Sequence, residues 1–341
     1  MTDAANSSYP LDRKVGYLRR PDSYPERPSH VDALETHMSW VFITDRHAYK
    51  LKKPVRHDFL DFSTLEARRR CCEEELRLNR RLAPDVYLDV VPLTADASGR
   101  LALAGDGTPV EWLVRMRRLP RERMLDAALA RGGVSDEQVS AVADVLAAFY
   151  RRLAPDALTA TELCGRLVRD VEACRTELRS PVHMLPSALF EGTAERLIAF
   201  VGREPELFGA RAAAGRIVEG HGDLRPEHVW LATPPLVIDC LEFNERLRQV
   251  DPFDEISYLG LECARLGAGW IGRRLLQTLS VALNDAVDPR LPRFYARYRA
   301  CIRARLALAH LAEPSPREPE RWQPLARSYL RLGSEFDPAG A

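Results

Sequence analysis

The sequence lacks the features that direct a protein to a membrane or to nucleic acid. None of its apolar runs approaches the ~20 residues of a membrane-spanning helix, and the first 30 residues have no apolar signal-peptide core. Lys plus Arg and Asp plus Glu both number 49, so no net charge attracts an anionic polymer or bilayer. These absences predict a cytoplasmic protein without a nucleic-acid or membrane partner, and they leave its oligomeric state open.

The cysteine pattern lacks the signature of a zinc site or a disulfide framework. The seven cysteines include no C-x-x-C pair, although Cys71 and Cys72 are adjacent. Cys240 and Cys263 lie in apolar surroundings. This usage is typical of free thiols in a reducing compartment.

The sequence does contain the pattern of two lobes. A chain of 341 residues is long for one hydrophobic core and suggests two lobes that share a cleft. Strand-like alternation dominates before Pro120, and a helical period dominates after it. This segregation predicts an α+β fold rather than a doubly wound sheet, in which strands and helices alternate. The predicted parts are a flexible leader over 1–30, a sheet lobe over 31–120, and a helical lobe over 121–341 with a β-rich insert at 219–243.

Local patterns indicate how the sheet lobe begins. Residues 39–55 are rich in aromatic and β-branched side chains and predict two strands around a turn at Asp45. Ser63 and Glu66 have capping-box spacing, which predicts that a helix begins there and ends before Pro84.

Several charged residues have the order that phosphoryl transfer requires. The reaction needs a lysine for the nucleotide phosphates, a carboxylate that holds the lysine, a carboxylate base, and carboxylates for Mg²⁺. Lys50 lies in an apolar strand, with Lys52 two residues later on the same face, and three glutamates follow at 73–75. Asp223 lies in the polar loop EGHGDLRPEHV, and Asp239 ends an apolar run 16 residues later.

These motifs resemble a known family. HGDL, then VIDCLEFN, then VDPFDEI resemble the aminoglycoside phosphotransferase and choline kinase family, which has a protein-kinase-like two-lobe fold. Residues 35–88 are similar to the N-lobe of a bacterial, largely uncharacterised phosphotransferase-like subgroup, and the resemblance covers roughly residues 30–310. It implies an antiparallel-sheet N-lobe with one helix, a mainly helical C-lobe, and ATP-dependent transfer to a hydroxyl of a small metabolite such as a sugar or amino sugar. Some members of the subgroup carry a second, P-loop kinase domain; the chain has no G-x-x-x-x-G-K-[ST], so that domain is expected to be absent.

The resemblance implies a role for each candidate in the catalytic region. Asp223 would be the catalytic base, and His221 would brace its loop through hydrogen bonds. Asp239 would hold Mg²⁺, and Asp251 would support the catalytic loop. The family has an asparagine as second metal ligand where this sequence has His228, an imidazole that suits Mg²⁺ poorly.

Two choices in the nucleotide site stay open. The resemblance implies that Lys50 contacts the α- and β-phosphates, and strand alternation favours it over Lys52. Glu75 would pair with that lysine, and its position on the apolar helix face favours it over Glu74. The loop ETHMSW has no glycine, so its contacts with phosphate would come from Thr36, Ser39 and backbone N–H groups. The residues expected at the adenine, where the interlobe hinge falls, are Met116 and Arg117.

The acceptor and the activity also leave alternatives. A polar segment after Asp239 is either a surface loop or a substrate rim formed by Glu242, Asn244 and Arg246. His228 and the glycine-free loop raise the alternative of a nucleotide-binding pseudokinase. A third alternative is a non-haem iron site, since His-x-Asp at 221–223 matches part of its triad and His310 lies downstream. No motif identifies the acceptor.

Overall fold

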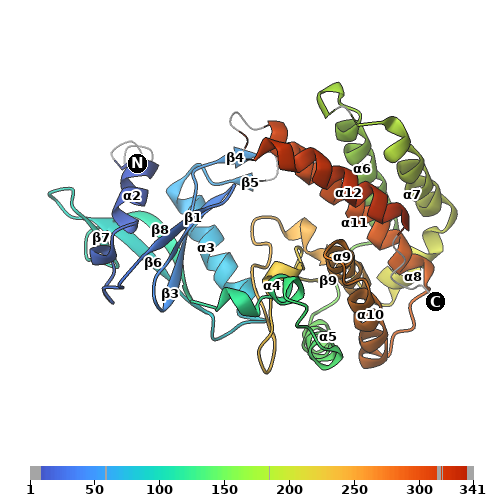
Figure 1. The fold of residues 1–341 in the computed structure, drawn as a ribbon, viewed down its shortest axis with the longest axis horizontal. Coiled ribbons are helices and arrows are strands. Elements are labelled where there is room, and N and C mark those ends of the chain that lie inside the picture. The colour runs from blue at the N-terminus through green and yellow to red at the C-terminus, as the bar shows by residue number, and fades with distance from the viewer. Residues whose placement is uncertain (1–8, 58–59, 184, 313–315, 317, 336–341) are drawn as a thin grey trace. The chain divides into compact units, whose positions relative to one another are not determined.

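The chain forms two compact units (Figure 1). In this computed structural model, residues 9–57, 60–183, 185–312, 316 and 318–335 are described. Unit 1 comprises Met1–Arg121 and Val237–Arg246, and unit 2 comprises Glu122–Leu236 and Leu247–Ala341. The segment at 237–246, which contains the predicted metal ligand Asp239, therefore belongs to the unit that contains the large sheet.

Unit 1 is built on a six-stranded sheet in the order β1-β2-β3-β8-β6-β7. Every neighbouring pair of its strands is antiparallel, which confirms the predicted antiparallel-sheet lobe. A further hairpin pairs β4 (Arg56–His57) with β5 (Leu60–Asp61). The strands of the sheet are β1 (Asp32–Glu35), β2 (Ser39–Ile43), β3 (His47–Lys52), β6 (Tyr87–Ala95), β7 (Leu101–Leu103) and β8 (Thr108–Arg117).

The alternation of β3 decides which of its side chains face the core. Tyr49 and Leu51 belong to the apolar core of unit 1, and both are almost fully buried. Successive side chains of a strand point to opposite faces, so Lys50 and Lys52 share the other face. The helix α3 (Leu65–Asn79) supplies the partners of both lysines on that face.

The predicted helix over 62–84 is confirmed as α3, but its cap differs by one residue. Thr64 is the N-cap, and its hydroxyl oxygen accepts from the N–H of Ala67 at 3.1 Å. Ser63 instead donates to Asp61. Serine and threonine both favour the N-cap position, and here Thr64 rather than Ser63 occupies it.

The prediction of a flexible leader over 1–30 is wrong for residues 9–30. They contain the helix α2 (Leu11–Leu18) and a short 3₁₀ turn at Pro21–Ser23. Val15 and Leu18 of α2 pack into the core of unit 1, and Lys14 Nζ lies 2.8 Å from Glu111 Oε2 in β8. Leu11 and Tyr17 of the same helix pack against this core as well. The residues before 9 lie outside the described part.

Leu18 tests whether α2 is an integral part of unit 1. Replacing it by alanine is expected to lower the free energy of unfolding by about 2–5 kcal/mol, because the side chain is fully buried and would leave a cavity. Urea unfolding followed by circular dichroism measures the change. Asp12→Ala, on the exposed side of the same helix, should leave the midpoint nearly unchanged. Equal unfolding midpoints for the two variants would support the prediction of a flexible leader.

Unit 2 is mainly helical, and its most buried helix is α9, in which every residue from Pro252 to Cys263 is buried. Two short strand pairs flank the predicted catalytic loop: β9 pairs antiparallel with β12, and β10 pairs with β11, the strand in which the chain passes between units. No helix in the described ranges is long and apolar enough to cross a membrane. The helices are α4 (Leu125–Ala130), α5 (Asp136–Arg151), α6 (Ala160–Leu178), α7 (Glu191–Arg203), α8 (Pro205–Ala213), α9 (Pro252–Arg265), α10 (Trp270–Leu283), α11 (Arg290–Ala309) and α12 (Pro319–Glu335), and the short strands are β9 (Val218–Glu219), β10 (Val229–Trp230), β11 (Leu236–Val237) and β12 (Gln249–Val250).

Candidate active site

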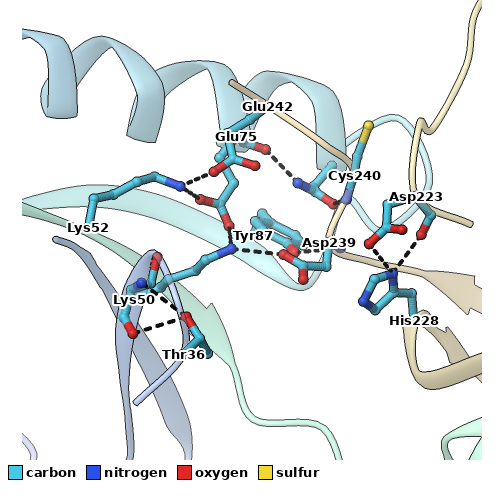
Figure 2. Close-up of polar contacts among 12 residues, drawn as sticks. Thr36, Lys50, Lys52, Glu75, Tyr87, Asp223, His228, Asp239, Cys240 and Glu242 are labelled. Carbon is cyan, nitrogen blue, oxygen red and sulfur yellow. Dashed lines mark hydrogen bonds and ion pairs between the residues drawn. The ribbon is translucent and has the colours of Figure 1, made fainter. Parts of the chain in front are cut away.

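Glu75 lies at the centre of a buried ion-pair network in unit 1 (Figure 2). Its Oε1 accepts from Lys50 Nζ at 2.9 Å, and its Oε2 accepts from Lys52 Nζ at 2.5 Å. Lys50 also donates to Asp239 Oδ1 at 2.8 Å, and Lys52 also contacts Glu242. Glu75 is thus the glutamate that holds a lysine, and it holds both candidates rather than one.

Glu74, the alternative to Glu75, lies on the solvent side of α3. Its carboxylate forms two hydrogen bonds with Arg77, each 2.7 Å long, and its side chain is 31% exposed. The Glu75 side chain is fully buried. Adjacent residues of a helix face different directions, so Glu75 contacts the lysines and Glu74 contacts Arg77.

The network is charged in spite of its burial. Burial favours the neutral form of Lys50, but the carboxylates of Asp239 and Glu75 outweigh it and raise the pKa of Lys50 well above its usual value. Burial likewise opposes the charge of Glu242, and Lys52 and Lys50 lower its pKa. Two ammonium groups thus face the three carboxylates of residues 75, 239 and 242. The surplus of one negative charge suits a divalent cation.

Asp239 has a left-handed backbone, with φ of +59°. This conformation is unfavourable for a residue with a Cβ and persists where neighbouring contacts fix it. Here the N–H of Asp239 donates to Tyr87 Oη at 3.0 Å, and the N–H of Cys240 donates to Asn79 Oδ1 at 2.8 Å. These bonds attach the segment at 237–246 to the sheet and α3, and they leave the Asp239 side chain 44% exposed.

Asp239 fits a Mg²⁺ ligand of the kind that binds together with a nucleotide. Mg²⁺ is commonly held by one or two carboxylates, with phosphates and waters as its other ligands. Within the described ranges, no group of three or more His, Cys, Asp and Glu could hold a metal by itself. The suggested iron triad of residues 221, 223 and 310 is therefore not assembled, and His310 stacks on Trp322 at 4.0 Å between ring centroids.

The predicted catalytic loop lies in unit 2 and is held by Glu255. The carboxylate of Glu255 accepts from the backbone N–H of His221 at 2.9 Å and from that of Gly222 at 2.5 Å. Tyr150 donates its hydroxyl to the same carboxylate at 2.8 Å. Gly222 has φ of +86°, which favours glycine. Glu255 therefore fixes the backbone immediately before Asp223.

The prediction that Asp251 supports this loop is wrong. Asp251 is the N-cap of α9, accepting from the N–H of Phe253 at 2.9 Å, and it pairs with Arg211 at 2.6 Å. Support comes from Glu255, one helical turn further along α9. Both residues lie in the VDPFDEI motif, and the sequence does not reveal which carboxylate turns toward the loop.

Two histidines bracket Asp223, and their hydrogen bonds determine their tautomers. His221 Nδ1 accepts from the N–H of Asp223 at 3.3 Å, so this nitrogen carries no proton. His228 Nδ1 lies 2.7 Å from the carbonyl oxygen of Asp223 and must donate, because a carbonyl only accepts. In the neutral His228 ring the lone pair is therefore on Nε2. The contact of His221 joins its ring to the backbone of the loop, and the bracing role of His221 stays a prediction.

The carboxylate of Asp223 is oriented by two residues that sequence analysis did not select. Tyr258 donates its hydroxyl to Asp223 Oδ1 at 3.0 Å, and Arg225 Nη1 lies 3.8 Å from Oδ2. Burial opposes the ionisation of Asp223, but Arg225, with His228 and Arg303, outweighs it and lowers the pKa of the carboxyl. Tyr258 follows Glu255 by three residues, a helical spacing that could have indicated a second contact with the loop.

Asp223 should remain ionised below the pH at which an unfolded aspartate is protonated. Since its folded pKa lies below the unfolded value of about 3.9, its ionised form stabilises the fold above that value, and this stabilisation is lost as the pH falls through the folded pKa. A ¹³C NMR titration of the carboxyl carbon measures the pKa, with Asp223→Asn identifying the signal. Arg225→Gln should raise the midpoint, because it removes a positive charge. A midpoint above that of unfolded aspartate would contradict the described charge environment.

The residues predicted to contact the nucleotide lie in the sheet of unit 1 and in one of its turns. Thr36 Oγ1 accepts from the N–H of Ser39 and donates to its carbonyl oxygen, each at 3.0 Å, so this pair closes the turn between β1 and β2. Met116 and Arg117 end β8, opposite residues 47–48 of β3.

The predicted rim after Asp239 is only partly a surface. Glu242 does not lie on a substrate rim: its carboxylate contacts Lys52 within the buried network, and its side chain is 9% exposed. Asn244 accepts from the N–H of Arg246 at 3.1 Å and caps a short turn, and Arg246 is exposed. The ion pair with Lys52 thus accounts for the position of Glu242, and a substrate rim at Asn244 and Arg246 stays a prediction.

The fold is that of small-molecule kinases. The chain matches a choline/ethanolamine kinase family protein from Mesorhizobium loti with a TM-score of 0.54 and 12% identity, covering 96% of this chain and 97% of the other. It matches choline kinase from Cryptosporidium parvum with a TM-score of 0.55 and 12% identity, covering 94% of each chain. An ethanolamine kinase from Plasmodium vivax matches with a TM-score of 0.53 and 8% identity, over 90% of this chain and 83% of the other. The predicted protein-kinase-like α+β fold is therefore confirmed.

At the level of sequence, the relatives are mycobacterial. Uncharacterized proteins of Mycobacterium tuberculosis and Mycobacterium bovis are each 33% identical over 289 residues. The match covers 84% of this chain but 56% of each relative, so the chain spans about half the length of the curated relatives it matches. No protein-family model matches the chain.

Proposed function

We propose that the protein is an ATP-dependent phosphotransferase that acts on a hydroxyl group of a small metabolite. The observation that carries the proposal is the buried Lys50–Glu75 pair, whose lysine also reaches Asp239. A fixed ammonium beside a partly exposed carboxylate supports the proposal, because phosphoryl transfer needs a phosphate contact and a metal ligand. The choline and ethanolamine kinases that share the fold have such an activity by name.

In this mechanism, positioning and charge supply the catalysis. Lys50 binds phosphate oxygens, and Glu75 keeps its ammonium group in place. Asp239 would hold Mg²⁺, which neutralises charge on the phosphates when it is bound. Asp223 accepts the proton of the acceptor hydroxyl; Tyr258 occupies its Oδ1, so Oδ2 is the oxygen that takes the proton.

A transfer assay with an unbiased acceptor pool tests the proposal. The protein is incubated with γ-labelled ATP, Mg²⁺ and a fractionated metabolite extract, and Asp223→Ala serves as the blank. Label should pass to a small molecule when the native protein is present, and it should not pass when the Asp223→Ala variant takes its place. Transfer of label by the blank at the native rate would show that Asp223 is not the base, and absence of transfer from every fraction would sink the proposal.

One observation favours a second candidate, a nucleotide-binding pseudokinase. His228 stands where the resembling family has asparagine, and its Nδ1 is engaged by the Asp223 carbonyl. An imidazole nitrogen is a softer ligand than an amide oxygen and suits Mg²⁺ less well. A thermal-shift titration with ATP and Mg²⁺ beside the transfer assay separates the two candidates: binding without turnover on any fraction identifies the pseudokinase.

A further inference from the structure

The carboxylates that could attract a cationic acceptor to unit 2 are engaged within the protein. Asp251 pairs with Arg211 at 2.6 Å, and Asp254 pairs with Arg299 at 2.6 Å. Glu255 accepts from the backbone of the catalytic loop. These three carboxylates of unit 2 therefore pair with groups of the protein itself. A polycationic acceptor needs an acidic surface.

One arginine lies close to the carboxylate of Asp223, and the charge of a second acts on it. Arg225 Nη1 lies 3.8 Å from Asp223 Oδ2. Arg303 of α11 donates to Glu262 at 2.9 Å, and Glu262 lies one turn after Tyr258 on α9, on the helix face that contacts Asp223. The positive charge of Arg303 acts on Asp223, and Arg225 and Arg303 repel each other. The positive charges of two arginines thus act on the carboxylate of the proposed base.

The hydrogen-bonding capacity of these arginines is not used up. The Nε–H of Arg225 is buried and has no hydrogen-bond partner among the residues that the structure describes. Its Nη2 contacts Glu227, and Arg303 shares Glu262 with Arg265. A buried donor without a partner is unfavourable, so an oxyanion that accepts from this group would be favoured.

The charge balance changes during the proposed reaction. The acceptor oxygen bonds to the γ-phosphorus as the bond from this phosphorus to the leaving oxygen of ADP breaks, and the acceptor proton passes to Asp223. Before transfer, three carboxylates (Asp223, Glu227, Glu262) face three guanidinium groups (Arg225, Arg265, Arg303). Protonation of Asp223 then leaves one positive charge in excess. An anionic group on the acceptor compensates it and a cationic group does not.

We propose that the acceptor carries a carboxylate or phosphate group near the phosphorylated hydroxyl, and that Arg225 and Arg303 bind this group. The inference rests on the proposed function, because it names the acceptor class of that same site. It distinguishes this protein from kinases of amino sugars, aminoglycosides and choline, whose acceptors are cations. Both oxyanions share the chemistry that a guanidinium recognises, a planar or tetrahedral group with several acceptor oxygens.

The test separates the metabolite extract by charge before the transfer assay. Ion exchange divides the extract into anionic, neutral and cationic fractions, and each is incubated with γ-labelled ATP, Mg²⁺ and the 341-residue chain. Label is expected in a product of the anionic fraction. Prior phosphatase treatment abolishes acceptor activity if the group is a phosphate and leaves it if the group is a carboxylate. Label only in the neutral or cationic fraction overturns the inference and leaves the proposed function standing; absence of label from every fraction overturns both.

Variants locate the recognition in the two arginines. Arg225→Gln and Arg303→Gln are each expected to lower kcat/KM for the anionic acceptor at least tenfold, mainly through KM, with the KM for ATP changed less than twofold. Arg303→Lys keeps the charge and should recover part of the loss. Arg265→Gln is the matched control, since Arg265 pairs with the same Glu262 and no described contact joins it to Asp223. Melting curves establish that each variant is folded. An unchanged KM in both glutamine variants overturns the assignment.

Discussion

Replacing Asp223 by alanine is expected to lower the rate of phosphoryl transfer by about 10³-fold, within the range that a positioned general base contributes. The carboxylate is the only group that the described contacts orient for this purpose: Tyr258 holds Oδ1, Glu255 holds the preceding backbone, and Arg225 keeps the carboxyl ionised. The fold should survive, because the Asp223 side chain is 31% exposed and its backbone bonds remain. Single-turnover kinetics with the acceptor found by the transfer assay measure the effect.

Two further variants make the result specific to proton transfer. Asp223→Asn keeps the shape and can still accept from Tyr258, but it cannot take a proton, so its loss should be nearly as large. Asp288→Ala removes another aspartate of unit 2, which pairs with Arg290, and should keep the native rate within twofold. If the asparagine variant retained most of the activity, Asp223 would act by orientation rather than as a base.

Replacing Glu75 by alanine is expected to destabilise the protein by about 3–5 kcal/mol, the cost of removing one partner from a buried ion pair. Glu75 is fully buried and receives hydrogen bonds from both Lys50 and Lys52. Without it, Lys52 retains only Glu242, and Lys50 is left to Asp239. Urea unfolding measures the loss, and ATP affinity by calorimetry should fall at the same time because Lys50 is no longer fixed.

The neighbouring residue supplies the control for this experiment. Glu74→Ala removes a carboxylate from the same helix, but one that pairs with Arg77 on the exposed side. Its unfolding midpoint should stay close to that of the native protein, since an exposed ion pair contributes little. A similar loss in both variants would point to helix propensity instead of the buried network.

The order of elements and the main charged residues were predictable because they depend on local patterns. Alternation identified the strands around Asp45, and the helical period identified α3 and the helices after Pro120. The order of HGDL, VIDCLEFN and VDPFDEI identified the fold, since a shared order of motifs is more specific than any one of them. Lys50, Glu75 and Asp239 meet in unit 1 as expected from that order.

The details that escaped prediction depend on which way a side chain turns in three dimensions. Lys52 appeared to be the rejected alternative to Lys50, although residues two apart in a strand share a face and both can be buried if carboxylates are available for each. Glu242 appeared to be a rim residue because the sequence cannot show that Lys52 needs a second partner. Asp251 and Glu255 are one helical turn apart in α9, and the sequence cannot show which of them meets the loop.

The contact between Lys50 and Asp239 makes the binding of nucleotide and of metal interdependent. In the free protein each of these groups satisfies the other. In the proposed mechanism, phosphate binds the lysine and Mg²⁺ binds the aspartate, so either ligand alone would weaken this ion pair and compensate only one of its two groups. Bound together, they replace one internal ion pair with two external ones. Positive cooperativity between ATP and Mg²⁺ follows, and thermodynamic linkage requires that each strengthens the other by the same factor.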